Sequence, residues 1–283
     1  MKARTALAAL LAAAALGLAW RVRGELDDYR RRAARLRSDW RSIAGIAGPA
    51  PLRLHAQVRE DAGTDRAPVV LVHGYGIGSS YFVPLAERLA GHVRVYAPDL
   101  PGHGRSDHDA RPLGIAELGA ALAAWMGARG LRGAVVVAHS HGCQVVLEAL
   151  ARDPGLACEL VLIGPTLAPQ ARGVARLLAR ALIGTLFERP SAGVWMALDY
   201  YRAGARVLAA ELRAMLAHAP EPLLAQVRVP VRVVRGSRDL VAPQRWAERV
   251  ARLTGAPAPA VIRGWGHAVH YDAPATVAGL ILG

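Results

Sequence analysis

Short runs of β-branched residues alternate with longer amphipathic stretches from about residue 52 to the end of the chain. The strand-like runs are 69–72, 93–96, 135–137, 160–163 and 231–234, with a weaker one at 260–262. Helical spacing of apolar residues occurs between them, at 81–90, 115–128, 143–151 and 244–253. This alternation predicts an α/β fold with a mostly parallel, doubly wound sheet that helices cover on both faces. The carboxyl ends of such strands share one edge, where loops can gather a site.

The alternation is interrupted once. The stretch between about residues 170 and 218 shows only helical patterns, at 172–187, 192–203 and 205–217. A purely helical insertion between two strands of one sheet is typical of a lid rather than of a separate domain. We therefore expect a single body over 52–283 with an all-helical cap at about 166–225.

The first segment, 1–24, is apolar and ends in arginines. Residues 6–20 carry no charge and are rich in Ala and Leu. As a helix they would span roughly 22 Å, short of the ~30 Å hydrocarbon core of a bilayer. A signal peptide fits that length, and an uncleaved membrane anchor and an ordinary helix are the alternatives. Arg21 and Arg23 follow at once, and cationic flanks resist translocation, which favours an uncleaved anchor with a cytoplasmic body over export.

The positive charge of the chain gathers near its start. The net charge is +13, and residues 1–41 hold ten Lys or Arg side chains against four Asp or Glu. Acids and arginines at helical spacing predict an Arg-rich linker helix over 25–51, and we expect the body to fold without residues 1–41. No recognition motif accompanies the charge, so we predict no nucleic-acid partner but membrane contact through residues 6–20.

Residues 135–143 combine a buried strand, a tight turn and the start of a helix around Ser140. Ala138 and Gly142 stand two residues before and two after the serine. Small residues are needed there because the strand and helix backbones nearly collide, and the turn holds the serine on its outside. An isolated match of this kind is common, and a capping serine is the alternative. The strand-to-helix junction favours a nucleophile.

A serine hydroxyl needs a base, and position selects it among ten histidines. His267 follows the last strand candidate and a bend framed by Gly264 and Gly266, with His270 as its nearest rival. Asp239 lies just beyond the run 231–234 and is predicted to fix the tautomer of the imidazole. A helix cap is the other interpretation of Asp239.

The loop that begins at His73 follows the strand-like run 69–72. It reads His-Gly-Tyr-Gly, and its glycines permit a sharp turn whatever else the loop does. We predict that the backbone N–H groups of Tyr75 and His141 form an oxyanion hole, since the latter begins a helix.

Five motifs in this order resemble the α/β-hydrolase superfamily, in its serine-nucleophile esterase and lipase-like branch with a helical lid. They are 73–76, 99–106, 138–142, 236–239 with Pro243, and 264–267 with Asp272 and Pro274. The resemblance runs from about residue 52 to the end and excludes 1–51. It implies the chain order Ser140, Asp239, His267 for the catalytic residues and a structural role for 99–106. Ala138, where a glycine is usual, is the one departure in the serine turn.

The predicted reaction is hydrolysis of a carboxylic ester through an acyl-enzyme intermediate. Phe187, Trp195 and Tyr200 of the lid are candidate contacts for an apolar part of a small ester substrate, unless they only pack the lid itself. Hydrolysis of a C–C bond, thioesterase or lactonase activity and acyl transfer use the same triad and stay open. A non-catalytic, membrane-tethered binding protein is the alternative of another class. The sequence implies no cofactor and no metal, because its histidine pairs are isolated.

Overall fold

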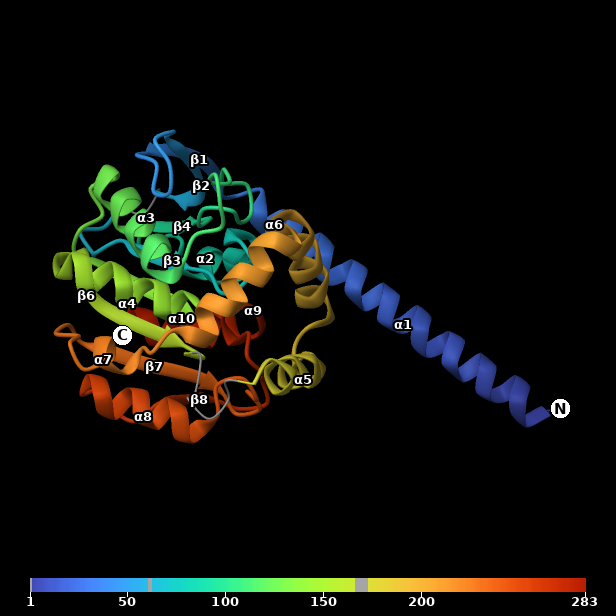
Figure 1. Cartoon of the computed structure of the whole chain (residues 1–283). Helices are drawn as coiled ribbons and strands as arrows, with labels where there is room; N and C mark the ends of the chain where they lie inside the picture. Colours follow the sequence, from blue (N-terminus) through green and yellow to red (C-terminus); the bar gives the residue numbers. More distant parts are fainter. Residues whose placement is uncertain (1, 61–62, 166–172) are drawn as a thin grey trace.

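The computed structural model describes residues 2–60, 63–165 and 173–283 (Figure 1). Within these ranges one sheet has the strand order β1-β2-β4-β3-β5-β6-β7-β8. Strands β3 to β8 run parallel, and β2 pairs antiparallel with β4 and with β1. The strands are β1 (Arg37–Ile43), β2 (Leu52–Arg59), β3 (Val69–Val72), β4 (Val95–Pro98), β5 (Ala134–His139), β6 (Ala157–Ile163), β7 (Val231–Gly236) and β8 (Ala260–Ile262).

Helices cover both faces of this sheet, which confirms the predicted doubly wound fold. Successive strand residues point to opposite faces, so Val70 packs with one core and Val69 and Leu71 with the other. The first face carries α3 (Ile115–Ala128), α4 (Gly142–Arg152) and α8 (Gln244–Thr254), and the second carries α2 (Val83–Leu89) and α10 (Pro274–Leu282). Short helices η1 (Ser79–Phe82), η2 (Pro154–Leu156) and α9 (Val269–Asp272) complete the connections.

The segment 25–51 differs from the predicted linker helix. Helix α1 (Lys2–Ala33) ends less than halfway through this segment. Strand β1 then pairs with β2 over its whole length. Most of β1 is exposed on both faces. An edge strand of this kind alternates charges much as a solvated helix does. The spacing of charged residues therefore does not distinguish the two, and the predicted helix was wrong here. The folded body therefore begins before residue 52, and removing 1–41 would cut into its sheet.

The second half of α1 packs on the body while its first half projects away from it (Figure 1). Tyr29 is buried, and its hydroxyl donates to the Ser80 carbonyl at 3.0 Å. Arg32 and Arg35 pair with Glu87 at 3.0 and 2.9 Å. In the part of the chain that the structure describes, no helix is both long enough and apolar enough to cross a bilayer.

The described part of the insertion between β6 and β7 is helical, as predicted. It consists of α5 (Val174–Gly184), η4 (Thr185–Phe187), α6 (Pro190–Ala217) and α7 (Glu221–Leu224). The two expected helices at 192–203 and 205–217 are halves of α6, separated at Gly204, whose φ of 77° is not helical. Residues 166–172, where we expected the lid to begin, lie outside the described residues.

Candidate active site

Ser140 occupies the turn between β5 and α4. Its φ of 56° is the only positive value among the described non-glycine residues. Such a conformation costs on the order of 1–3 kcal/mol and is kept where the surroundings impose it. A Cβ at Gly142 would lie 2.4 Å from the His73 carbonyl oxygen and 2.7 Å from that of Val72, which explains the glycine. Ala138 fits its site fully buried, so the turn tolerates the departure noted above.

His267 and Asp239 lie next to this serine, although both are far from it in sequence. Nε2 of His267 is 2.9 Å from Oγ of Ser140, and Nδ1 is 2.8 Å from Oδ2 of Asp239. Burial opposes a charge on the imidazole, but Asp239 outweighs it and raises the pKa of His267. The structure thus brings the three predicted residues into one hydrogen-bonded chain.

Backbone N–H groups hold the second oxygen of Asp239. Its Oδ1 accepts from Val241 and Ala242, both at 2.8 Å. These donors belong to the loop after β7, whereas α8 begins only at Gln244. Asp239 is therefore not the cap of that helix, and its free oxygen faces His267.

The rival His270 has a different environment. It is fully buried, and its ring lies 4.6 Å from that of Phe82 and 4.2 Å from that of His139. Neither ring nitrogen has a hydrogen-bond partner among the described residues. Burial, and then the neighbouring His267, lower its pKa to about 3, so it stays neutral and serves packing.

His73 anchors the loop that lies against the serine. The ring accepts the Leu100 N–H at its Nε2 atom, at 2.9 Å, and burial lowers its pKa to about 4. A Cβ at Gly74 would stand 3.1 Å from the Ser140 Cβ, so loop and nucleophile turn touch. Across 2–60, 63–165 and 173–283, no backbone acceptor or side chain takes the N–H of Tyr75 or of His141. Two donors beside Ser140 are what an oxyanion hole requires, and their role stays a prediction.

An apolar cavity of about 310 Å³ opens beside the serine and His267. Its wall includes Tyr200, one of the three lid residues expected there. The other apolar side chains come mainly from the two lid helices, among them Leu177, Leu178, Leu182, Met196, Leu212 and Met215. A cavity of this character suits a flexible hydrocarbon group.

Phe187 and Trp195 lie elsewhere, which corrects the expectation for the lid. Trp195 packs against Tyr29 of α1, with ring centroids 4.0 Å apart. Phe187 lies under the guanidinium of Arg238 at 5.1 Å, and its carbonyl accepts the Gly266 N–H. Aromatic content alone does not show which face of a helix meets a site. The helical spacing of Leu177, Leu178 and Leu182 was the better signal.

Two lid carboxylates next to the site were not singled out from the sequence. Glu188 lines the cavity, and burial raises its pKa. Glu211 is fully buried behind the His73 loop. An acid inside the apolar stretch 205–217 is the only sequence signal for Glu211.

Comparison with known proteins agrees with this fold. A family model described as the alpha/beta hydrolase family matches residues 69–280. A pimeloyl-acyl carrier protein methyl ester esterase from Xanthomonas campestris is 42% identical over 86 residues, which is 30% of this chain and 32% of that protein. The chain thus spans between about a quarter and a third of the length of the curated relatives it matches.

Solved structures share the fold over most of the chain. An esterase from Thermogutta terrifontis superimposes with a TM-score of 0.73 at 22% identity, covering 86% of this chain and 96% of its own. A bacterial membrane phospholipase A gives a TM-score of 0.69 at 21% identity, covering 99% of this chain and 96% of its own. At such identities the likeness concerns the fold.

Proposed function

The chain belongs to the alpha/beta hydrolase family, and on that premise we propose that it is a serine-dependent carboxylic ester hydrolase. One observation carries the proposal: the hydrogen-bonded chain from Ser140 through His267 to Asp239. The match to methyl ester esterases supports the ester over other substrates of the same triad.

In the proposed mechanism, Oγ of Ser140 attacks the ester carbonyl while Nε2 of His267 takes its proton. Asp239 keeps the other imidazole proton on Nδ1 and stabilises the cation that forms. The N–H groups of Tyr75 and His141 hold the oxyanion of the tetrahedral intermediate. The imidazolium then protonates the leaving alcohol. Water, activated by the same histidine, releases the acid from the acyl-enzyme.

We propose an apolar acyl chain for the substrate. The cavity beside Ser140 is lined by leucine and methionine side chains of the lid. Each methylene buried there contributes about 0.8 kcal/mol. A thioester, a lactone or a diketone could react at the same serine, so the substrate panel must contain them.

An active-site fluorophosphonate distinguishes the enzyme from a binding protein with this fold. The probe should label the folded wild type, and p-nitrophenyl esterase activity should fall in proportion to the labelling. Ser140→Ala should abolish both, whereas Ser42→Ala, at an exposed serine of β1, should leave both intact. Folded wild type that takes no label would favour the binding protein, and labelling that persists in Ser140→Ala would remove the proposed nucleophile.

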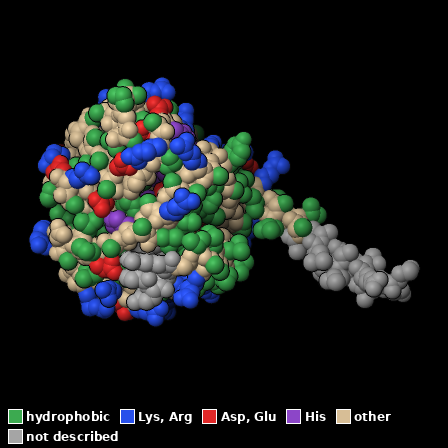
Figure 2. Space-filling view, in the orientation of Figure 1, with side chains coloured by type: hydrophobic (Ala, Val, Ile, Leu, Met, Phe, Trp, Pro, Cys, Tyr) green, Lys and Arg blue, Asp and Glu red, His purple; other side chains and the backbone are tan. Residues whose placement is uncertain are grey.

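We propose further that the protein works at a membrane surface. Leu16, Leu18 and Trp20 of α1 are exposed, as are Leu182 and Leu186 of the lid at 73% and 78%. Figure 2 shows hydrophobic side chains on the side of the body from which α1 leaves. Apolar patches of this kind mark binding surfaces.

Sedimentation with phosphatidylcholine and phosphatidylglycerol vesicles tests it. The wild type should pellet with vesicles, and Leu182→Glu combined with Leu186→Glu should weaken binding. Val261→Glu adds a charge at an exposed residue of β8 and should leave vesicle binding unchanged. A wild type that stays in the supernatant would contradict the membrane proposal and leave the esterase proposal standing.

A further inference from the structure

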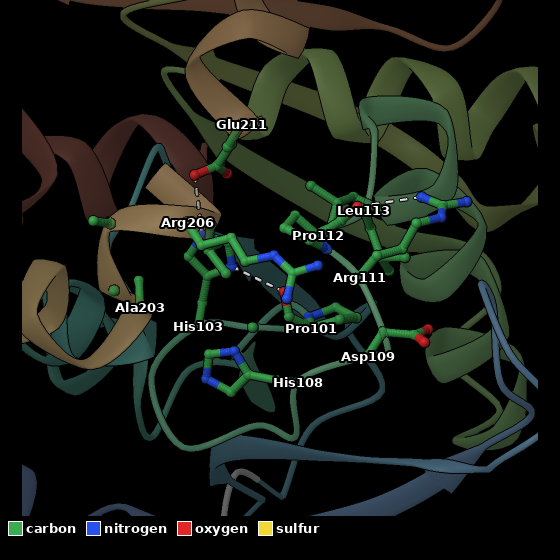
Figure 3. Close-up of a pocket in the computed structure, with 15 residues that line it drawn as sticks. Pro101, His103, His108, Asp109, Arg111, Pro112, Leu113, Ala203, Arg206 and Glu211 are labelled. Atoms are coloured by element: carbon green, nitrogen blue, oxygen red, sulfur yellow. Dashed lines mark hydrogen bonds and ion pairs between the residues drawn. The ribbon is translucent and has the colours of Figure 1, made fainter. Parts of the chain in front are cut away.

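Glu211 lies in the second half of the lid helix α6, behind the loop that carries Tyr75. Only 2% of its surface is exposed. It forms part of the wall of a second cavity, of about 260 Å³, that lies between α6 and the 101–113 segment. Figure 3 shows its carboxylate directed from the helix toward His103. A buried acid requires partners, because isolated charge is costly away from water.

Three segments of the catalytic body meet at this carboxylate. Oε2 accepts the Gly76 N–H at 3.1 Å and lies 3.1 Å from Nε2 of His103. Oε1 lies 3.1 Å from Nδ1 of His141, a close electrostatic contact rather than an aligned hydrogen bond. Gly76 and His141 belong to the two segments whose N–H groups are expected to bind the oxyanion. Glu211 thus contacts both halves of that site from behind.

The same helix packs directly on the Tyr75 loop. The Tyr75 hydroxyl donates to the Leu208 carbonyl at 2.9 Å. Gly76 has a φ of 66°, and a Cβ there would lie 2.5 Å from Leu208 and 2.7 Å from Tyr200. The loop therefore has little room to move while α6 is in place.

Glu211 is ionised in this setting. Burial opposes its charge, but His103 and then His141 outweigh burial and lower the pKa of Glu211 to about 2. Burial likewise opposes a proton on His103, and Glu211 outweighs it and raises the pKa of that histidine. For His141 burial prevails and its pKa is lowered. Nδ1 of His103 lies 3.1 Å from the Pro101 carbonyl oxygen and Nε2 lies 3.1 Å from Glu211, so both ring nitrogens face acceptors and Glu211 is held as a carboxylate against this histidine.

We propose that Glu211 is a positioning residue, which fixes the Tyr75–Gly76 peptide and His141 so that both N–H groups meet the oxyanion. This inference depends on the proposed ester hydrolysis, since only a tetrahedral intermediate presents that charge. Misplacing preorganised donors removes stabilisation that the transition state needs more than the bound substrate does. The loss should therefore fall on kcat rather than on KM.

Glu211→Gln tests the proposal against Asp199→Asn as the matched control. Asp199 is a second buried carboxylate of α6 that binds the same loop farther along, at the Gly78 N–H and the Ser80 hydroxyl. With p-nitrophenyl acetate, Glu211→Gln should lower kcat about 10- to 100-fold and change KM less than about threefold. Asp199→Asn should keep kcat within about threefold of the wild type even if it lowers Tm as much as Glu211→Gln does.

An alkylboronic acid supplies a readout that lost stability alone would not move. The boron adds to the serine Oγ and forms a tetrahedral adduct whose oxygen occupies the oxyanion site. Its Ki should rise in Glu211→Gln by the factor by which kcat/KM falls, as for a transition-state analogue. Glu211→Asp keeps the charge with a shorter reach and should fall between wild type and Glu211→Gln.

The outcomes separate the two proposals. Wild-type kcat in Glu211→Gln, or a lowered kcat with unchanged boronate affinity, would overturn the positioning role. If Glu211→Gln does not fold, Glu211→Asp decides: a kcat and Ki equal to those of wild type would overturn the role too. A wild type that hydrolyses no ester would instead contradict the proposed function, and boronate affinity would still measure the effect of Glu211.

Discussion

Oδ2 of Asp239 faces Nδ1 of His267 at 2.8 Å, while Oδ1 is held by two backbone N–H groups. The carboxylate therefore cannot rotate without losing one set of contacts. A proton on Nδ1 of His267 satisfies Asp239 and leaves the Nε2 lone pair directed at Ser140, 2.9 Å away. The relationship fixes both the tautomer and the orientation of the base.

Asp239→Asn should lower kcat about 10³- to 10⁴-fold, because an amide at this position favours the wrong imidazole tautomer. The Asn oxygen can still accept the Val241 and Ala242 N–H groups, so Tm should change little. Asp109→Asn is the matched control, since Asp109 also accepts a backbone N–H, that of Ala47, but does not line the cavity beside Ser140. Turnover of Asp239→Asn within tenfold of the wild type would show that this carboxylate does not orient the base.

The pH profile of kcat/KM should show an acid limb whose midpoint lies above 6.5. The base works only when neutral, and Asp239 raises the pKa of His267 from its ordinary value of 6.5, against burial. Activity is therefore lost as pH falls through that raised pKa. In Asp239→Asn the limb should move to lower pH. Stopped-flow or steady-state assays from pH 5 to 9 measure both, and a wild-type midpoint below 6.5 would contradict the interaction.

The central sheet and the site edge could be predicted because they depend on local signals. Buried parallel strands such as β5 are runs of apolar β-branched residues, and the triad residues each follow a strand. Ser140 also sits in a turn that tolerates only small neighbours. These constraints act within a few residues, so the sequence displays them directly.

The edge of the sheet and the contacts of the lid depend on distant partners. β1 forms a strand because its backbone pairs with that of β2. Nothing within 37–43 distinguishes this segment from a charged helix. Trp195 turns away from the cavity because α1 presents Tyr29 to it. The partners of Glu211 come from three other segments. Tertiary contacts of this kind leave no periodic trace in the chain.

Deleting residues 1–20 and deleting residues 1–43 should have different effects. The shorter deletion keeps the Tyr29 contact and β1, so Tm and esterase activity in solution should stay near wild type. The longer one exposes β2 and removes the buried side chains of Tyr29 and Ile43, each contributing about 1.5–3 kcal/mol. We expect its Tm to fall by about 10 °C. Equal melting temperatures for the two truncations, measured by calorimetry, would contradict the role of β1.

The length of the acyl chain should control kcat/KM if the apolar cavity binds the acyl group. Each methylene placed there contributes about 0.8 kcal/mol, equivalent to about a fourfold gain in kcat/KM. Activity toward p-nitrophenyl esters should therefore rise in steps from acetate until the cavity of about 310 Å³ is full. A flat profile over these esters would mean that the acyl group lies elsewhere.

Leu212→Trp should shift the preference to shorter acyl chains, because the indole would occupy space that a long acyl chain needs. Leu212 lies on the cavity wall, whereas Leu198, on the same helix, is exposed and does not line it. Leu198→Trp is thus the matched control for adding an indole to α6. We expect Leu212→Trp to keep acetate hydrolysis within about threefold and to lose at least about tenfold on the longest good substrate, since overpacking costs about 1–3 kcal/mol. The same chain-length profile in both variants would place the acyl group outside this cavity.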